Sequence, residues 1–236
     1  KTHICKALLS TVRGNKHTAI SVASSGIAAL LLPGGTTAHS RFGIPVPVFA
    51  NSISKIKKQS SEAKILKDSK LIVWDEAVMA HKHAIECVDR LLRDIMNNEK
   101  PFGGKTTVFL GDFRQILPVI PNGSPECMVE ACVKNSYIWD YIQEYRLTQN
   151  LRVMFNSDGA AEKKKLKKFA NWLLDLGDGA IPNAVGSIPD LIKLPDAIVA
   201  KSKNLEEFIQ ELYPNLSSAF RDIDYFDKKC ILAPIN

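Results

Sequence analysis

Long hydrophobic runs are absent, because no apolar stretch approaches the roughly 20 residues that a helix needs to cross a bilayer. Cysteine is scarce, and the five residues of this type show no C-x-x-C spacing. A zinc site or a disulfide framework is therefore not indicated, and reduced thiols are the simpler interpretation. The segment His81-Lys82-His83 lacks cysteine or acidic partners at a suitable spacing, so it predicts the first turn of a helix instead of a metal site.

Polar residues follow two short apolar runs at the point where each run ends. Residues 71–74 precede Asp75-Glu76, and residues 106–110 precede Gly111-Asp112-Phe113-Arg114-Gln115. Short apolar runs rich in β-branched residues predict buried strands, and the polar endings of parallel strands gather at the carboxyl edge of their sheet. That edge is where open α/β folds bind nucleotides.

The pair Asp75-Glu76 has the composition that a magnesium–nucleotide site requires. One carboxylate can hold Mg²⁺, directly or through water, and its neighbour can orient and deprotonate the water that attacks the terminal phosphate. The alternative is that both acids cap a helix over residues 78–97, since acids are favoured in a first turn. The pair taken alone does not separate these interpretations.

The second strand ending supplies Gln115. Gly111 allows a tight exit from the strand, and a glutamine at this edge can hydrogen-bond a γ-phosphate or the attacking water and lose that bond when the phosphate leaves. The alternative is a loop amide bonded to backbone. Taken together, the two strand endings favour the interpretation of Gln115 as a phosphate sensor.

The first two residues, Lys1-Thr2, match the end of the G-x-x-x-x-G-K-[ST] phosphate-loop pattern, but no glycine cradle is present before them. The dipeptide is common and carries no weight alone. It gains weight from a predicted strand over residues 18–23 and from the two strand endings, in that order along the chain. We therefore expect the chain to begin inside its own phosphate loop, with Lys1 reaching the β- and γ-phosphates and Thr2 placing its hydroxyl on Mg²⁺.

Predicted strands alternate with predicted helices. This alternation indicates an α/β fold with a mainly parallel sheet and helices on both faces. The expected strands cover residues 18–23, 70–74, 106–110 and 229–233. The expected helices cover residues 1–12, 27–32, 83–97 and 204–212, with a further polar helix inside residues 51–70.

The net charge of +6 and the pI near 9.0 favour an anionic partner without establishing one. The densest basic block lies at residues 162–168 and precedes the apolar side chains of Phe169, Trp172 and Leu173. This spacing predicts a helix with a cationic outer face, which we interpret as a solvated surface in preference to a DNA clamp.

Several ordered motifs resemble those of the petite-integration-frequency (PIF-type) DNA helicases of superfamily 1. They lie at residues 24–29 with 34–42, 74–77, 111–119 and 147–152. Residues 101–105 and 231–236 also resemble the plant and Helitron-transposon branch of that family. The resemblance spans nearly the whole chain.

The resemblance implies a P-loop NTPase of RecA-like fold that uses ATP and Mg²⁺ to move 5′ to 3′ on single-stranded DNA and to unwind DNA junctions. It implies family roles in DNA repair, recombination and telomere maintenance. It also implies an intracellular protein, in the nucleus or alternatively the mitochondrion, that we expect to be a monomer. The implied catalytic, nucleotide and metal residues are Lys1, Thr2, Asp75, Glu76, Gln115 and Arg152.

Arg152 matches the motif arginine that reaches the γ-phosphate in this family. A guanidinium suits that place because it stays charged and can bind two phosphate oxygens as charge shifts in the transition state. The alternative is a surface ion pair near Glu144.

Residues 34–42 match the family segment that lines the DNA path. Paired glycines allow close approach of the backbone, and short hydroxyl side chains can donate to phosphate or sugar. We expect DNA contacts from Thr37, His39, Ser40 and Phe42, with the Phe42 ring stacking on a base. The alternative is a helix N-cap at Thr36 or Thr37 with Phe42 in the core.

Two domains are expected. Residues 1–155 form the RecA-like ATPase domain with a small wedge-like insertion at about 44–68, and residues 156–236 form a linker and the truncated start of a second RecA-like domain. Because such motors work by closing two domains on ATP, we expect this piece alone to have at most weak nucleotide or DNA affinity.

Two other functions remain open. One is a P-loop ATPase that remodels protein complexes without unwinding DNA. The other is a non-catalytic nucleic-acid-binding remnant of a transposon helicase, which is kept open by departures from the family pattern at Ser25 and Ile235.

Overall fold

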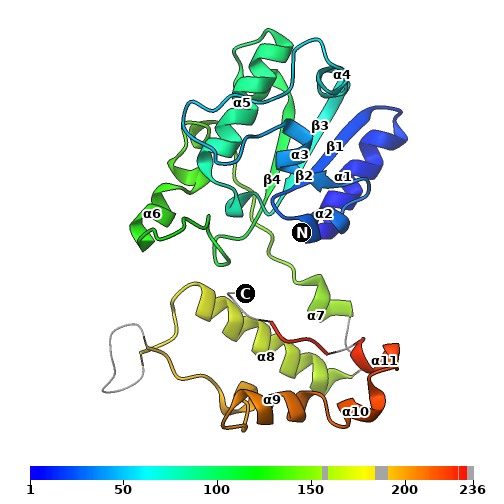
Figure 1. Cartoon of the computed structure of the whole chain (residues 1–236), viewed down its shortest axis with the longest axis vertical. Helices are drawn as coiled ribbons and strands as arrows, with labels where there is room; N and C mark the ends of the chain where they lie inside the picture. Colours follow the sequence, from blue (N-terminus) through cyan, green and yellow to red (C-terminus); the bar gives the residue numbers. More distant parts are fainter. Residues whose placement is uncertain (156–158, 184–190, 228, 233–236) are drawn as a thin grey trace. The chain divides into compact units, whose positions relative to one another are not determined.

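The computed structural model describes residues 1–155, 159–183, 191–227 and 229–232 (Figure 1). The chain divides into two compact units, Lys1–Gly179 and Ala180–Asn236. The domain boundary predicted at residue 156 lies before the lysine-rich helix, whereas this division lies after it.

The first unit is built on a four-stranded sheet with the order β2-β1-β3-β4, and every neighbouring pair is parallel. The strands are β1 (Thr18–Ala23), β2 (Thr36–Thr37), β3 (Ser69–Asp75) and β4 (Thr106–Leu110). Two of them, β1 and β4, have the predicted bounds, and β3 extends the prediction by one residue at each end. The prediction of a parallel sheet is therefore confirmed.

Alternating side chains along the strands supply two hydrophobic cores, one on each face of the sheet. On β3, Leu71 and Val73 face one core, and Ile72 and Trp74 face the other. Because both faces are apolar, the strands are nearly continuous hydrophobic runs, which is why sequence alone locates them.

Helices cover both of these faces, as predicted (Figure 1). The helices α1 (Thr2–Gly14) and α2 (Gly26–Leu30) pack on the first core through Cys5, Leu9 and Ala29. The second core is covered by the helices α3 (Ala38–Phe42), α4 (Ser61–Asp68) and α5 (Lys82–Met96).

The helix predicted inside residues 51–70 is shorter in the structure, because only α4 forms there. Residues 43–60 before it form a loop that is attached to the core by hydrogen bonds. The Oγ atom of Ser54 donates to the carbonyl oxygen of Phe42 over 2.6 Å, and Nη2 of Arg90 donates to the carbonyl oxygen of Ser52 over 2.8 Å.

Short helices and helical turns lie before and after β4. These are η1 (Ala77–Met79), η2 (Pro101–Gly104), α6 (Pro125–Glu130), η3 (Val133–Asn135) and η4 (Trp139–Tyr141).

A buried polar network joins two of these turns to α5. The carboxylate of Asp89 accepts hydrogen bonds from the backbone N–H of Phe102 at 2.6 Å and from the Tyr137 hydroxyl at 2.8 Å, and it pairs with Arg93. Glu86 accepts a hydrogen bond from the Ser136 hydroxyl at 2.8 Å. These contacts stabilise the chain between α6 and η4 against the second core.

Two helices complete the first unit, namely α7 (Leu151–Phe155) and α8 (Ala160–Gly177). The helix α8 is the predicted lysine-rich helix. Its lysines are exposed, as expected for a solvated face, and the rings of Phe169 and Trp172 stack with their centroids 5.8 Å apart.

The second unit contains η5 (Asp196–Ile198), α9 (Leu205–Leu212), α10 (Leu216–Ala219) and α11 (Ile223–Phe226). The predicted helix at 204–212 is confirmed. The predicted strand at 229–233 is wrong for residues 229–232, and residue 233 lies outside the described residues. A strand needs a neighbour to bond, and the described residues of this unit supply none. Nowhere in the described ranges is a helix both long and apolar enough to cross a bilayer.

Candidate nucleotide site

The central strand β3 ends in the pair that the sequence singles out. Asp75 is the last residue of β3 and is 3% exposed. Its Oδ1 atom accepts a hydrogen bond of 2.9 Å from the backbone N–H of Glu76. Glu76 has left-handed backbone angles, φ 51° and ψ 37°, which L-residues rarely adopt. The chain therefore turns sharply at this position and places two carboxylates at the carboxyl edge of the sheet.

Lys1 lies against both carboxylates. Its Nζ atom is 3.1 Å from Oδ1 of Asp75 and also donates a hydrogen bond to Oε1 of Glu76. Burial alone lowers the pKa of the Lys1 ammonium, but hydrogen bonds to Glu76 and Asp75 and their negative charge outweigh burial, so the pKa is raised above its ordinary value. Lys1 is therefore charged at neutral pH.

Ser24, for which sequence patterns predict no role, connects the ends of β1 and β3. The backbone N–H of Ser24 donates to the carbonyl oxygen of Asp75 at 3.1 Å, and its Oγ atom donates to the carbonyl oxygen of Glu76 at 2.6 Å. The indole Nε1–H of Trp74 donates to the same Oγ atom at 3.1 Å. Ser24 thus holds the turn at Glu76. The sequence signal is its position directly after a predicted strand.

The donor set fits a magnesium–nucleotide complex. Carboxylate oxygens are the ligands that Mg²⁺ prefers, and an ammonium group complements phosphate. The Oε2 atom of Glu76 is buried and has no hydrogen-bond partner within the part of the chain that the structure describes. A buried carboxylate oxygen without a partner is costly unless a ligand or water satisfies it.

Few protein ligands for a metal are present. Within the described ranges, no group of three or more His, Cys, Asp or Glu side chains is arranged to hold an ion. Mg²⁺ in nucleotide sites usually has one or two carboxylates, with waters and phosphate oxygens completing its coordination. Thr2 is the first residue of α1, directly after Lys1, so its hydroxyl lies on the segment that would face such an ion.

Gln115 lies in the loop that follows β4. Leu110, the last residue of β4, is the Cα partner of Asp75 in the sheet, so this loop and the turn at Glu76 leave from the same edge. A Cβ atom on Gly111 would lie 2.5 Å from Cγ1 of Val78, so only glycine permits this close exit. The backbone N–H of Gln115 donates to the carbonyl oxygen of Asp112 at 3.0 Å, and its side chain is exposed.

The structure therefore joins Lys1, Asp75 and Glu76 directly. It places Gln115 on the neighbouring strand's loop, where no described contact connects its side chain to those three residues. The backbone of Arg152 lies in α7, but its side chain lies outside the described residues. The roles of Gln115 and Arg152 stay predictions.

The segment predicted to contact DNA contains β2 and α3. The Oγ1 atom of Thr37 caps α3 by accepting a hydrogen bond of 3.3 Å from the backbone N–H of Ser40. The Ser40 side chain is exposed. His39 is half-buried, and burial lowers the pKa of its imidazole.

Phe42 requires a correction. Its side chain is 0% exposed, and its ring stacks on Trp74 with the centroids 5.8 Å apart. Its ring faces the second core, so it cannot stack on a base in this structure. The prediction of a DNA contact at Phe42 is wrong, and the alternative of an N-cap at Thr37 with Phe42 in the core is correct.

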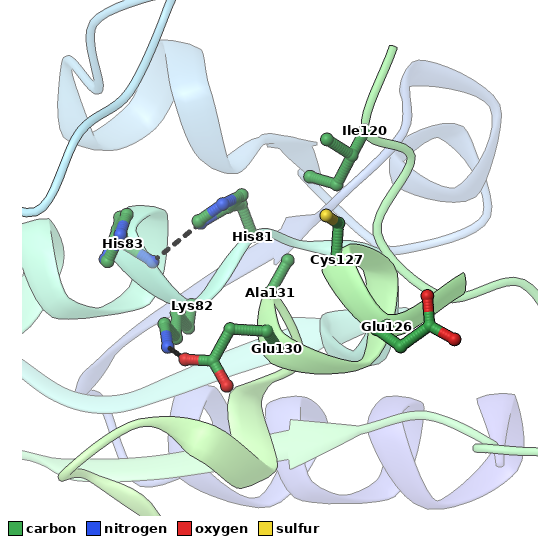
Figure 2. A pocket seen from close by; sticks show the side chains of 8 residues that line it. All are labelled: His81, Lys82, His83, Ile120, Glu126, Cys127, Glu130 and Ala131. Carbon is green, nitrogen blue, oxygen red and sulfur yellow. Dashed lines mark hydrogen bonds and ion pairs between the residues drawn. The ribbon is translucent and has the colours of Figure 1, made fainter. Parts of the chain in front are cut away.

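His81 and His83 lie beside a pocket of about 460 Å³ between the turn before α5 and helix α6 (Figure 2). His81 is the N-cap of α5, and its Nδ1 atom accepts a hydrogen bond of 3.1 Å from the backbone N–H of His83. The prediction of a helix N-terminal turn is confirmed. Lys82 attaches α6 to this turn through its side-chain pair with Glu130 and through a 2.8 Å hydrogen bond from its backbone N–H to the carbonyl oxygen of Ala131.

Comparisons with known proteins identify relatives of this chain. The sequence profile described as PIF1-like helicase matches residues 1–187. The ATP-dependent DNA helicase PIF1 of Candida albicans is 25% identical over 209 residues, which are 84% of this chain and 22% of that protein.

Two solved structures resemble the fold. The crystal structure of the Pif1 helicase from Candida albicans matches with a TM-score of 0.62 and 25% identity over 84% of this chain and 44% of that chain. The Bacteroides Pif1 helicase in complex with ADP-AlF3 and ssDNA matches with a TM-score of 0.51 and 25% identity over 70% of this chain and 42% of that chain. The predicted RecA-like α/β fold is thereby confirmed. This chain spans less than half the length of each of these relatives.

Proposed function

This chain belongs to the PIF1-like helicase family, and we propose that it supplies the nucleotide-binding domain of an ATP-dependent DNA helicase. The observation that carries the proposal is the position of Lys1, whose ammonium group contacts Asp75 and Glu76 at the carboxyl edge of a parallel sheet. Lysine beside paired acids at that edge is the arrangement that phosphate and magnesium require.

In the proposed mechanism, Lys1 binds the β- and γ-phosphates, and Thr2 and Asp75 would hold Mg²⁺. When bound there, the ion would supply positive charge to offset the charge that develops on the phosphate oxygens. Glu76 accepts a proton from the attacking water, and Ser24 maintains the turn that aims its carboxylate. The proposed role of Gln115 is to sense the γ-phosphate, and that of Arg152 is to bind it.

The proposed substrates are single-stranded DNA and DNA junctions, along which the complete protein moves 5′ to 3′. Thr37, His39 and Ser40 would contact the strand. Support comes from the family and from the Bacteroides relative, which was solved with a nucleotide analogue and ssDNA. We also propose that residues 1–155 form the ATPase domain and that residues 156–236 form the start of a second RecA-like domain. We further propose that the chain belongs to the plant or Helitron-transposon branch of the family. The proposed cellular roles are DNA repair, recombination and telomere maintenance in the nucleus.

The test uses the complete protein that contains this chain. Glu76→Gln removes the proton acceptor but keeps the size of the side chain, so ATP turnover should fall about 100-fold or more while binding of a fluorescent ATP analogue persists. Glu99→Gln is the matched control, because the Glu99 side chain is 97% exposed. Normal turnover in Glu76→Gln would overturn the assignment.

DNA dependence separates the two ATPase functions. Turnover that rises on addition of single-stranded DNA supports the helicase, and turnover that ignores DNA favours an ATPase that remodels protein complexes. Partial duplexes that carry either a 5′ or a 3′ single-stranded tail then test the direction of movement, because a 5′ to 3′ motor needs the 5′ tail.

A further inference from the structure

The two ends of α1 contact different parts of the first unit. Lys1, at the N-terminal end, contacts Asp75 and Glu76, and Arg13, in the last turn, contacts the segment before β2. The helix between them has 13 residues, or about 20 Å of rigid backbone. It therefore connects the nucleotide site to the segment that carries Thr37.

Arg13 makes three hydrogen bonds through its guanidinium group. Its Nη1 atom donates to the carbonyl oxygen of Pro33 at 2.9 Å, and its Nη2 atom donates to the carbonyl oxygen of Ala19 at 3.0 Å and to Oγ of Ser21 at 3.4 Å. The Oγ atom of Ser21 also donates to the carbonyl oxygen of Pro33 at 2.9 Å. Two side chains thus fix one carbonyl, and we call this set of bonds the Pro33 clamp.

Besides the bonds of β2, the backbone directly after Pro33 is held by a 2.9 Å hydrogen bond from the N–H of Gly35 to the carbonyl oxygen of Leu32. The strand β2 is two residues long, lies at the edge of the sheet, and pairs with β1 only at Thr36 and Thr37. A Cβ atom on Gly35 would lie 2.3 Å from the carbonyl oxygen of Ala29, so the turn runs directly against the end of α2. So short an edge strand has few ladder bonds, and the clamp supplies fixed contacts in their place.

Thr37 connects the clamp to the proposed DNA segment. It is the last residue of β2 and also the N-cap of α3, which carries His39 and Ser40. A shift of the Pro33 turn would therefore move the start of α3. Polar contacts to DNA lose most of their energy when the donor moves by an ångström or more.

We propose that Arg13 is a positioning residue that sets the DNA-contacting segment through the Pro33 clamp, without touching DNA itself. The proposal rests on the proposed function for its consequence and on the hydrogen bonds of Arg13 for its geometry. Arginine is required because a single ammonium group cannot reproduce the two-pronged contact with the carbonyls of Pro33 and Ala19.

The test replaces Arg13 with methionine in the complete protein. Arg13→Met keeps the apolar stem but removes every donor, and Lys6→Met removes one charge from an exposed position of the same helix as the matched control. We expect Arg13→Met to weaken binding of oligo-dT about ten-fold relative to Lys6→Met, with the DNA-free KM for ATP unchanged. Oligo-dT binding equal to that of Lys6→Met would overturn the proposal.

Salt dependence separates positioning from direct contact. A side chain that binds phosphate contributes about 1 to the slope of log Kd against log salt concentration, whereas a positioning residue contributes nothing. We expect Arg13→Met and Lys6→Met to have equal slopes. A slope reduced by about 1 in Arg13→Met alone would show that Arg13 contacts DNA directly. A parallel loss of DNA-free ATP turnover would show that Arg13 stabilises the whole domain. Either result would overturn the proposal.

Hydrogen exchange tests the clamp without DNA. Backbone amides over residues 34–40 should exchange faster in Arg13→Met while those of α5 stay protected, and unchanged exchange over 34–40 would overturn the clamp. A wild-type protein that fails to bind DNA would instead refute the proposed function. If Arg13→Met does not fold, Ser21→Ala serves as the second variant. It removes the hydrogen bond that Oγ of Ser21 donates to Pro33 and the one that it accepts from Arg13, so we expect faster exchange and about three-fold weaker DNA binding.

Discussion

The ammonium nitrogen of Lys1 lies 3.1 Å from Oδ1 of Asp75, a carboxylate whose side chain is only 5% exposed. The first residue of the chain and the last residue of the central strand therefore form one charged unit with Glu76. This unit is both a structural ion pair and the proposed binding place of the triphosphate.

Replacing Lys1 should affect folding as well as nucleotide binding. Lys1→Gln leaves Asp75 buried without a cation, and we expect a loss of about 2 kcal/mol in the free energy of unfolding, less than for a fully buried pair. Urea denaturation measures this loss. Lys58→Gln breaks the exposed pair with Asp94 and should cost at most about 1 kcal/mol. Equal losses in the two variants would contradict the structural role of Lys1.

The burial of Phe42 predicts a purely structural effect. Phe42→Ala opens a cavity against Trp74 and should lower the free energy of unfolding by about 3–5 kcal/mol, as measured by urea denaturation. Phe49→Ala, at a position 60% exposed, should change it by less than about 0.5 kcal/mol. The milder Phe42→Leu should bind single-stranded DNA like the wild type. Weaker DNA binding by a well-folded Phe42→Leu variant would contradict this prediction and would support a contact between Phe42 and a DNA base.

The N-cap of α5 should make stability depend on pH. The pKa of His81 is lowered by burial and then by the neighbouring His83 and Lys82, partly offset by Glu86. Because the folded state favours neutral His81, its contribution is complete above the unfolded pKa of about 6.5 and is lost as pH falls through the lower folded pKa. Protonation at Nδ1 also removes the acceptor for the N–H of His83.

The matched variants are His81→Asn, which keeps a cap acceptor but does not titrate, and His17→Asn at an exposed position. Unfolding free energies between pH 7.5 and pH 5 should fall less in His81→Asn than in the wild type or in His17→Asn. Identical pH profiles for all three proteins would contradict the assignment.

Tyr137 should make the stability of the fold depend on pH in the alkaline range. Partial burial of the phenol, whose residue is still 45% exposed, followed by its hydrogen bond to Asp89, raises the pKa of the phenol to about 12. Its contribution is therefore complete below the unfolded pKa of about 10 and is lost as pH rises through the folded value. The wild type should be more stable than Tyr137→Phe at pH 8 by about 1 kcal/mol, and this difference should shrink towards pH 12. Tyr141→Phe, at a residue 66% exposed, should show no such difference.

Sequence patterns located the sheet because its central strands are buried on both faces. The apolar runs of β3 and β4 have no polar interruption, that of β1 is interrupted only by Ser21, and the ends of the strands meet at one edge in any parallel sheet. The contact of Lys1 with Asp75 and Glu76 was predicted from the phosphate-loop pattern at Lys1-Thr2 taken together with that rule. The strand β2 was not predicted, since two threonines form a strand only through pairing with Val22 and Ala23.

Other features can be identified only from the three-dimensional structure. The helix α3 has only five residues, too few for hydrophobic periodicity to show that Phe42 faces the core. The roles of Ser24 and Arg13 depend on backbone carbonyls, which no sequence pattern identifies. The strand expected at 229–233 does not form over the described residues 229–232, because an apolar run can become a strand only beside a partner.

The left-handed backbone of Glu76 has one more consequence. A residue with a β-carbon in that conformation costs about 1–2 kcal/mol compared with glycine. Glycine at this position would relieve that strain, but the protein would lose the carboxylate that contacts Lys1 and that we propose as the acceptor of a proton from water. The backbone strain at the end of β3 is therefore a cost of the proposed role of Glu76, and a substitution chosen to relieve it should abolish ATP turnover.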